Sequence, residues 1–128
     1  MTRATAHIGT VDYATTIEVA GCTLTADEPP DNGGQDAGLA PYDLLTASLA
    51  ACTAITLRMY AERKGWPLTG ADVDIHFYRE NDREKIQRTI TLHGELTGEQ
   101  ITRLGDISER TPVTRTLKSG LDIATIVK

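Results

Sequence analysis

Cys52 is the residue of this sequence whose side chain most directly raises the question of chemistry. It lies in "LAACTAI", where no neighbour is charged or aromatic. A thiolate is a strong nucleophile, but a cysteine on an apolar helix is more often a small core residue with a weak S–H donor. The flanking sequence therefore has to decide between a reactive thiol and a packing residue.

The other groups capable of chemistry are few. Cys22 follows a turn in an expected N-terminal strand, and we interpret it as a buried structural residue. Two cysteines without CxxC spacing form neither a disulfide framework nor a zinc site, so we expect no metal. His76 and His93 alternate onto the polar face of a hairpin and are expected to be solvated. No Ser, His and Asp set and no phosphate-binding loop is visible, and nothing predicts a cofactor.

The element that must position Cys52 is a helix of about six turns. Pro41 suits a first helical turn, and the chain runs without a breaker to Gly65, with Arg63 and Lys64 near the C-terminal end. Its apolar residues are not confined to one stripe before Arg58. We therefore expect its first four turns to be buried nearly all round, which requires cover on both sides.

Strands are expected on either side of this helix. Polar and β-branched residues alternate over the first 26 residues and predict short antiparallel strands. A loop follows in "DEPPDNGGQDAGLAP", either a binding loop or a solvated connector. Further on, a turn at "NDRE" predicts a hairpin in which Ile75 faces Ile90 and Val73 faces Leu92, with His76 opposite Thr89.

The C-terminal third predicts two helices and a strand. Thr97 stands three residues before Gln100, a capping-box spacing that begins the first of these helices. A short helix is expected at "PVTRTLKSG", and the tail "LDIATIVK" is expected to be one last strand. The whole pattern predicts an α+β fold, with an antiparallel sheet and a long central helix.

Length and charge limit the classes of partner. A chain of 128 residues with 40% apolar content fits one domain spanning residues 1–128. Its net charge of -5 argues against nucleic acid and anionic membrane surfaces. The start has no apolar signal region after Arg3, and no apolar run approaches the roughly 20 residues needed to cross a bilayer. We therefore expect a soluble cytoplasmic protein.

Two segments give the chain a family resemblance. "DEPPDNGGQDAGLAPYDLLTASLAACTAITLRMYAERKGWPL" contains a Gly-rich loop, a Pro-led helix and a helical cysteine, and "RTPVTRTL" follows nearer the C-terminus. In these features the chain resembles the OsmC-like family of osmotically inducible protein C and organic hydroperoxide resistance proteins. The resemblance implies an intertwined homodimer with two long antiparallel helices at its centre. It also implies a thiol at the subunit interface that reduces organic hydroperoxides.

The resemblance assigns roles to individual residues. Cys52, eleven residues after Pro41, matches the peroxidatic cysteine, whose thiolate attacks the O–O bond and leaves a sulfenic acid and an alcohol. The family's glutamate after the proline is replaced by Tyr42, so Asp43 is the candidate acid, although it lies about 13 Å along the helix axis from Cys52. Arg115 is the candidate positive charge beside the thiol. The side chains expected to bind the substrate are Tyr42, Leu45, Leu49, Ile55 and Met59.

Thr111 is the largest departure from the family pattern. It stands before Pro112, where the family has its resolving cysteine, so no internal disulfide can form there. The family's activating arginine comes from the N-terminal strand region, where this chain has only Arg3, on a terminus expected to fray. A catalyst of this kind needs an external thiol or dithiol reductant. The alternative is a non-catalytic module of the same fold that binds a small hydrophobic or acyl ligand at the dimer interface.

Overall fold

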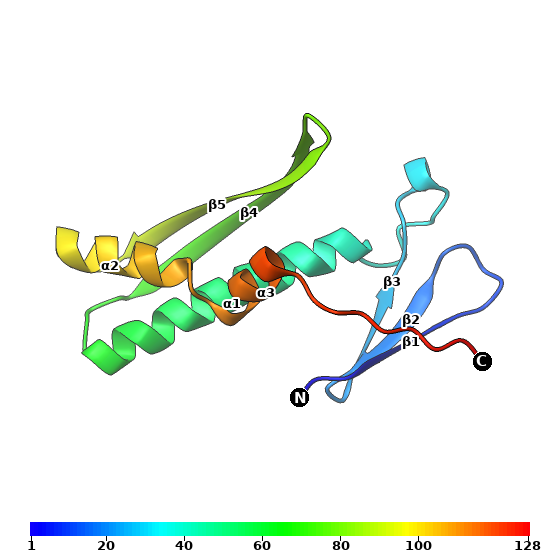
Figure 1. Cartoon of the computed structure of the whole chain (residues 1–128), viewed down its shortest axis with the longest axis horizontal. Helices are drawn as coiled ribbons and strands as arrows, with labels where there is room; N and C mark the ends of the chain where they lie inside the picture. The colour runs from blue at the N-terminus through cyan, green and yellow to red at the C-terminus, as the bar shows by residue number, and fades with distance from the viewer. The chain divides into compact units, whose positions relative to one another are not determined.

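The computed structural model describes residues 1–128 as two compact units, residues 1–45 and 46–128 (Figure 1). The first unit holds three strands and a short 3₁₀ helix, and the second holds a strand hairpin, two short helices and most of one long helix. Helix α1 (Pro41–Lys64) begins in the first unit and supplies the longest element of the second. The predicted α+β class with antiparallel strands and a long helix is confirmed, whereas the single domain stays a prediction.

The first unit contains the antiparallel strands expected from the alternating N-terminal residues. Strands β1 (Ala4–Ile8), β2 (Thr15–Val19) and β3 (Cys22–Ala26) form a three-stranded sheet in that order. Ala20 and Gly21 form the tight turn between β2 and β3, with φ angles of 51° and 77°. Two positive φ values in a row give a turn whose twist matches the strands, and glycine adopts them without strain.

The Gly- and Pro-rich loop is organised around Asp27, which is 3% exposed. The carboxylate accepts four backbone N–H groups at 2.8 to 3.2 Å, from Tyr13, Glu28, Gln35 and Ala37. The loop contains one short helix, η1 (Pro30–Asn32). A Cβ atom at Gly34 would lie 1.8 Å from the Glu28 carbonyl oxygen, so only glycine fits there. Irregular structure was expected here, but the ordering role of Asp27 was not.

Helix α1 begins and ends where the sequence predicts. Pro41 is its first residue, and Asp43 accepts the backbone N–H of Ala40 at 2.9 Å. At the other end Gly65, with φ of 69°, breaks the helix, and the N–H of Trp66 donates to the Ala61 carbonyl at 2.9 Å. This pair of a left-handed glycine and a returning N–H group is a Schellman termination.

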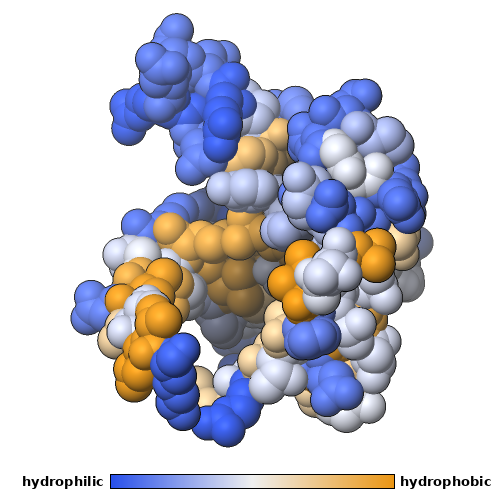
Figure 2. Space-filling view, turned by 90° about the vertical axis from the view of Figure 1, so that its right-hand side faces the viewer, coloured by the Kyte–Doolittle hydropathy of each residue, from blue (hydrophilic) through white to orange (hydrophobic).

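Only one stripe of α1 is buried, at every fourth residue: Leu49, Thr53, Leu57 and Ala61. The expectation of a helix buried nearly all round is therefore wrong for the single chain. Ile55 and Met59 are 55% and 58% exposed, and hydrophobic side chains elsewhere also reach the surface (orange in Figure 2). The second unit has one two-stranded sheet. This sheet and the later helices pack on one side of α1, so they leave its other side uncovered.

By length and composition alone, α1 is long and apolar enough to cross a membrane. The prediction that no apolar run approaches that length is therefore wrong. The core helix of a soluble protein passes the same test, and Leu57 and Ala61 of α1 belong to the hydrophobic core of the second unit with Leu68 and Leu104. The core accounts for the apolar character of the buried stripe.

The hairpin pairs β4 (Gly70–Glu80) with β5 (Arg83–His93), but in a register two residues from the predicted one. Ile75 lies opposite Arg88 and Val73 opposite Ile90, so His76 faces Gln87. The cause is the turn, which uses only Asn81 and Asp82, both with positive φ, in place of the four residues of "NDRE". Because the shift is an even number, each side chain keeps its predicted face.

Two helices follow the hairpin as expected, but the last strand does not form. Helix α2 (Gly98–Ser108) has a complete capping box between Thr97 and Gln100. Helix α3 (Pro112–Ser119) begins with Thr111 as its N-cap. Residues 121–128 have no secondary structure and are exposed throughout. The predicted strand in "LDIATIVK" is wrong for the single chain, because alternating apolar residues make a strand only where a neighbour accepts their backbone hydrogen bonds.

Candidate functional site

Cys52 lies half-buried on α1, at the border between the buried stripe and an exposed apolar surface. Leu49 and Thr53, which belong to the buried stripe, lie on one side of Cys52. On the other, Ile55 follows three residues later and Met59 four residues after that, which places them on neighbouring turns of the same face. Cys22 is exposed at the start of β3, so the expectation that it is buried is wrong.

Arg88 connects the turn of α1 that carries Cys52 to the beginning of α3. Its Nη1 donates to the Thr53 hydroxyl at 3.0 Å and to the Thr114 hydroxyl at 2.9 Å. The Thr114 and Thr111 hydroxyls lie 2.6 Å apart. One guanidinium therefore holds Thr53, the neighbour of Cys52, close to the threonine pair of α3. None of the contacts of Arg88 is to Cys52 itself.

The Arg88 side chain is only 11% exposed, because β5 turns it onto the apolar face of the hairpin opposite Ile75. A charged side chain is rarely buried without a partner. The carboxylate of Glu109 lies 3.5 Å from Arg88 and 2.7 Å from the Lys118 amine. The Lys118 ammonium, and to a smaller degree Arg88, lower the pKa of Glu109 despite an opposing effect of burial.

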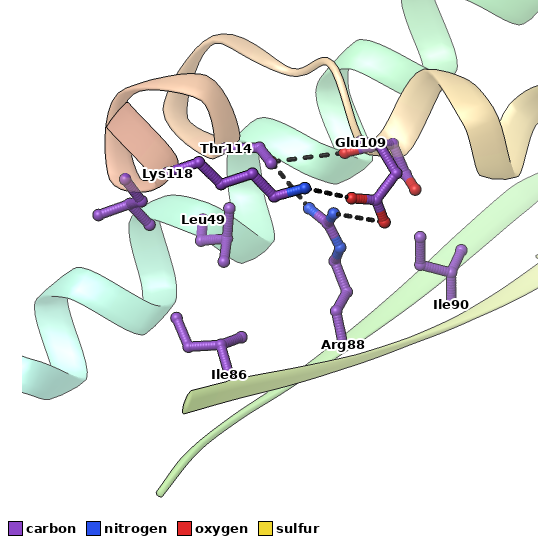
Figure 3. Close-up of a pocket in the computed structure, with 9 residues that line it drawn as sticks. Leu49, Ile86, Arg88, Ile90, Glu109, Thr114 and Lys118 are labelled. Carbon is purple, nitrogen blue, oxygen red and sulfur yellow. Dashed lines mark hydrogen bonds and ion pairs between the residues drawn. The ribbon is translucent and has the colours of Figure 1, made fainter. Parts of the chain in front are cut away.

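A cavity of about 400 Å³ opens beside this cluster, as Figure 3 shows, and we call it the Arg88 cavity. Arg88 and Glu109 lie close together, with Ile90 to one side of Arg88, Ile86 to the other on β5, and Leu49 on α1. The residues that line it are Leu49, Ile86, Arg88, Ile90, Ser108, Glu109, Thr114, Leu117 and Lys118. The volume is in the range of small-molecule pockets.

The residues predicted to bind a substrate are distributed over both units of the chain. Leu49 lines the Arg88 cavity, whereas Ile55 and Met59 lie on the exposed side of α1. Tyr42 and Leu45 belong to the first unit.

The two predicted charged partners of the thiol lie in the first turn of α1 and on α3. Asp43 caps the first turn of α1, nine residues before Cys52. Arg115 is exposed on α3 and does not line the Arg88 cavity, although its N–H donates to the Thr111 carbonyl at 3.0 Å.

Arg88 is the residue that the sequence analysis missed. The signal was present: in "KIQRTITLH" it occupies the same alternating positions as Ile86, Ile90 and Leu92, which all face the core side of the hairpin. A charged side chain at one of these core-facing positions needs hydrogen-bond or ion-pair partners inside the fold. Of the two histidines of the hairpin, His93 contacts Asp72 at 2.6 Å and His76 stacks on Tyr78. No group of three or more His, Cys, Asp and Glu side chains could hold a metal ion.

The family of the chain follows from a match between its sequence and a family model. A model described as OsmC-like protein matches residues 33–126, which include the second part of the loop, α1, the hairpin and both later helices. The chain belongs to the OsmC-like family. The resemblance read from its two motifs is thereby confirmed, and among curated proteins no relative matches it.

Solved structures share the OsmC-like fold at low sequence identity. The OsmC like protein from Mycoplasma pneumoniae has a TM-score of 0.77 at 21% identity, over 92% of this chain and 87% of that chain. The organic hydroperoxide resistance protein OsmC from Legionella pneumophila gives 0.67 at 21% identity, over 92% and 89%. A Vibrio cholerae protein assigned to organic hydroperoxide resistance, with captopril bound in one of its active sites, gives 0.69 at 20% identity, over 95% and 87%.

These likenesses establish the OsmC-like fold, and some of the proteins that share it carry hydroperoxide resistance in their names. In this OsmC-like chain the hydroxyl of Thr111 takes part in capping α3, accepting the N–H of Thr114 at 3.3 Å. The position that resembles a resolving cysteine is thus occupied by a fully buried N-cap residue.

Proposed function

We propose that this OsmC-like protein reduces organic hydroperoxides through Cys52 in a one-cysteine cycle. The observation that carries the proposal is the Arg88 cluster, which holds the Cys52 turn of α1 next to the start of α3. In the family pattern these two segments carry the peroxidatic and resolving cysteines. The half-buried thiol at the edge of an apolar helix face suits a bulky organic peroxide.

The proposed cycle consumes one peroxide and two external thiol groups. The Cys52 thiolate attacks one oxygen of the O–O bond, forming S–OH, while the alkoxide leaves and takes a proton to become an alcohol. Because Thr111 has no thiol, an external thiol attacks the sulfenic acid, releasing water and forming a mixed disulfide. A second external thiol, or the second sulfur of a dithiol, restores Cys52 and leaves as a disulfide. Both cysteines are free thiols, which suits a reducing cytoplasm.

We further propose that the working form is an intertwined homodimer. The exposed apolar side of α1, with Ile55 and Met59 beside Cys52, supports a partner helix there. In such a dimer the peroxide would bind where the side chains around Cys52 meet the partner.

The test is intact mass after stoichiometric cumene hydroperoxide on reduced protein. We expect wild type and Cys22→Ser to gain one oxygen and Cys52→Ser to gain none at that position. With excess peroxide and no thiol, wild type should progress to the sulfinic acid. If Cys52 gains no oxygen, the peroxidase proposal fails.

The alternative function is a ligand-binding module that does not turn over peroxide. One observation favours it: the Arg88 cavity is well formed but no thiol lines it. Under this alternative the protein binds a small hydrophobic or acyl ligand, and Cys52 stays reduced in the mass experiment.

A further inference from the structure

We propose that the Arg88 cavity binds a small aliphatic monocarboxylate, with its carboxylate at the Arg88 guanidinium and its chain against Leu49, Ile86, Ile90 and Leu117. The inference deepens the ligand-binding alternative by naming the chemistry of the ligand, and it does not require the thiol of Cys52. It rests on the charge, the free hydrogen-bond capacity and the apolar walls of the cavity.

The charge of the cavity is not balanced. Its charged lining residues are Arg88, Glu109 and Lys118, two cations and one anion. Glu109 lies 0.8 Å closer to Lys118, at 2.7 Å, than to Arg88, at 3.5 Å. The nearly buried Arg88 guanidinium therefore shares its one counter-ion, Glu109, with Lys118, which lies closer to that carboxylate. A net charge of +1 in a site that also presents four apolar side chains favours one bound monoanion.

The guanidinium also has unused hydrogen-bond capacity. Arginine carries five N–H donors, of which the two on Nη1 serve Thr53 and Thr114. The contact of Nη2 with Glu109, at 3.5 Å, is longer than a good hydrogen bond. A carboxylate matches an edge of the guanidinium with two parallel bonds, as neutral ligands cannot. The donors left over are therefore suited to a carboxylate.

The walls select the rest of the ligand. Leu49, Ile86, Ile90 and Leu117 offer no partner for a second charge or a sugar hydroxyl, and an unpaired polar group buried there would be costly. A volume of about 400 Å³ suits a small molecule. An aliphatic chain with one carboxylate satisfies the charge, the donors and the walls together.

The first experiment measures binding of sodium octanoate to the Cys52→Ser protein by titration calorimetry and by amide NMR. We expect saturable binding with shifts concentrated on β5 and α3. Octanol, which lacks the charge, and acetate, which lacks the chain, should each bind at least about tenfold more weakly. Octylamine should not compete with octanoate. Octanol binding as tightly as octanoate would overturn the proposal.

Variants test the charge arrangement. Arg88→Gln should weaken octanoate binding at least about tenfold, since a charged hydrogen-bonded pair is lost. Glu109→Gln removes the competing anion from an exposed side chain and should strengthen binding about two- to fivefold. Arg83→Gln, an exposed arginine on the same strand, is the matched control and should change nothing.

Glu109→Gln decides the question even if Arg88→Gln does not fold, because weaker binding in that variant contradicts the charge argument. The outcome is also separable from the peroxidase proposal. Octanoate is measured on a protein without the Cys52 thiol, and peroxide oxidation is measured without octanoate.

Discussion

Arg88 connects several elements near Cys52. From β5 it reaches α1 through Thr53 and α3 through Thr114, and its guanidinium approaches Glu109 just beyond α2. No buried side-chain nitrogen or oxygen is left without a hydrogen-bond partner. A cluster of this kind is stable only while each member keeps its partners.

We predict that Thr114→Val destabilises the fold by about 1–3 kcal/mol, because it leaves a nearly buried arginine donor without its acceptor. Urea unfolding at neutral pH measures the change. Thr116→Val, an exposed threonine on the same helix, is the control and should stay within about 0.5 kcal/mol. Equal midpoints for the two variants would show that the Arg88 bond to Thr114 contributes nothing.

A second residue-scale prediction concerns Thr111. Thr111→Cys should trap oxidised Cys52 as an internal disulfide, because the Arg88 cluster holds the start of α3 beside the Cys52 turn. The variant should then resist conversion to the sulfinic acid, at a cost of about 1 kcal/mol for the lost N-cap. Intact mass before and after a dithiol reductant tests it. Oxidation of Cys52 without a disulfide would mean that the two Cα atoms lie more than about 7 Å apart.

The loop around Asp27 should become less stable in acid. The N–H of Ala37 above all, then those of Glu28, Gln35 and Tyr13, lower the pKa of this carboxyl from 3.8, against an opposing effect of burial. The folded loop thus binds the proton more weakly than the unfolded chain. Its contribution to stability is full above the ordinary pKa and is lost as pH falls through the lowered one.

The measurement is amide hydrogen exchange at Gln35 and Ala37 between neutral pH and pH 3. Asp27→Asn should lose protection of these amides already at neutral pH, since a neutral amide cannot replace a carboxylate that accepts four donors. Asp31→Asn, exposed in the same loop, serves as the control. Unchanged protection in Asp27→Asn would refute the anchoring role.

The elements that were predictable from sequence are those with local signals. Pro41 and Gly65 mark both ends of α1, and the Thr97 to Gln100 spacing marks the start of α2. The hairpin register was less accessible, because a two-residue turn of Asn81 and Asp82 lacks the glycine that usually announces it. Arg88 was missed since its partners come from α1 and α3, far away in sequence.

Some apolar residues that the sequence pattern predicts to be buried are exposed in the single chain. The apolar pattern of α1 and the alternating tail of residues 121–128 predicted burial, but Ile55 and Met59 of α1 and the whole tail are exposed in the single chain. Exposed apolar patches of this kind mark interaction surfaces. A sequence pattern predicts that a residue is buried, but it does not say whether the same chain or a partner covers that residue.

We predict that the protein is a homodimer in solution. By light scattering after size exclusion at micromolar concentration, wild type should show twice the 13.9 kDa of one chain. Met59→Glu places a carboxylate on the exposed apolar side of α1, where a partner helix would bury it. An unpaired buried charge costs about 3–5 kcal/mol, so the dimer should weaken at least a hundredfold.

Thr102→Glu adds the same charge at an exposed polar position of α2 and should leave the dimer intact. Circular dichroism checks that both variants fold. The proposed dimer would also affect the chemistry, because in the proposed function the partner completes the apolar surroundings of Cys52. Met59→Glu should therefore slow oxidation of Cys52 by cumene hydroperoxide more than oxidation by hydrogen peroxide, which has no apolar group to bind. A wild-type monomer, or equal slowing for the two peroxides, would contradict an interface site around Cys52.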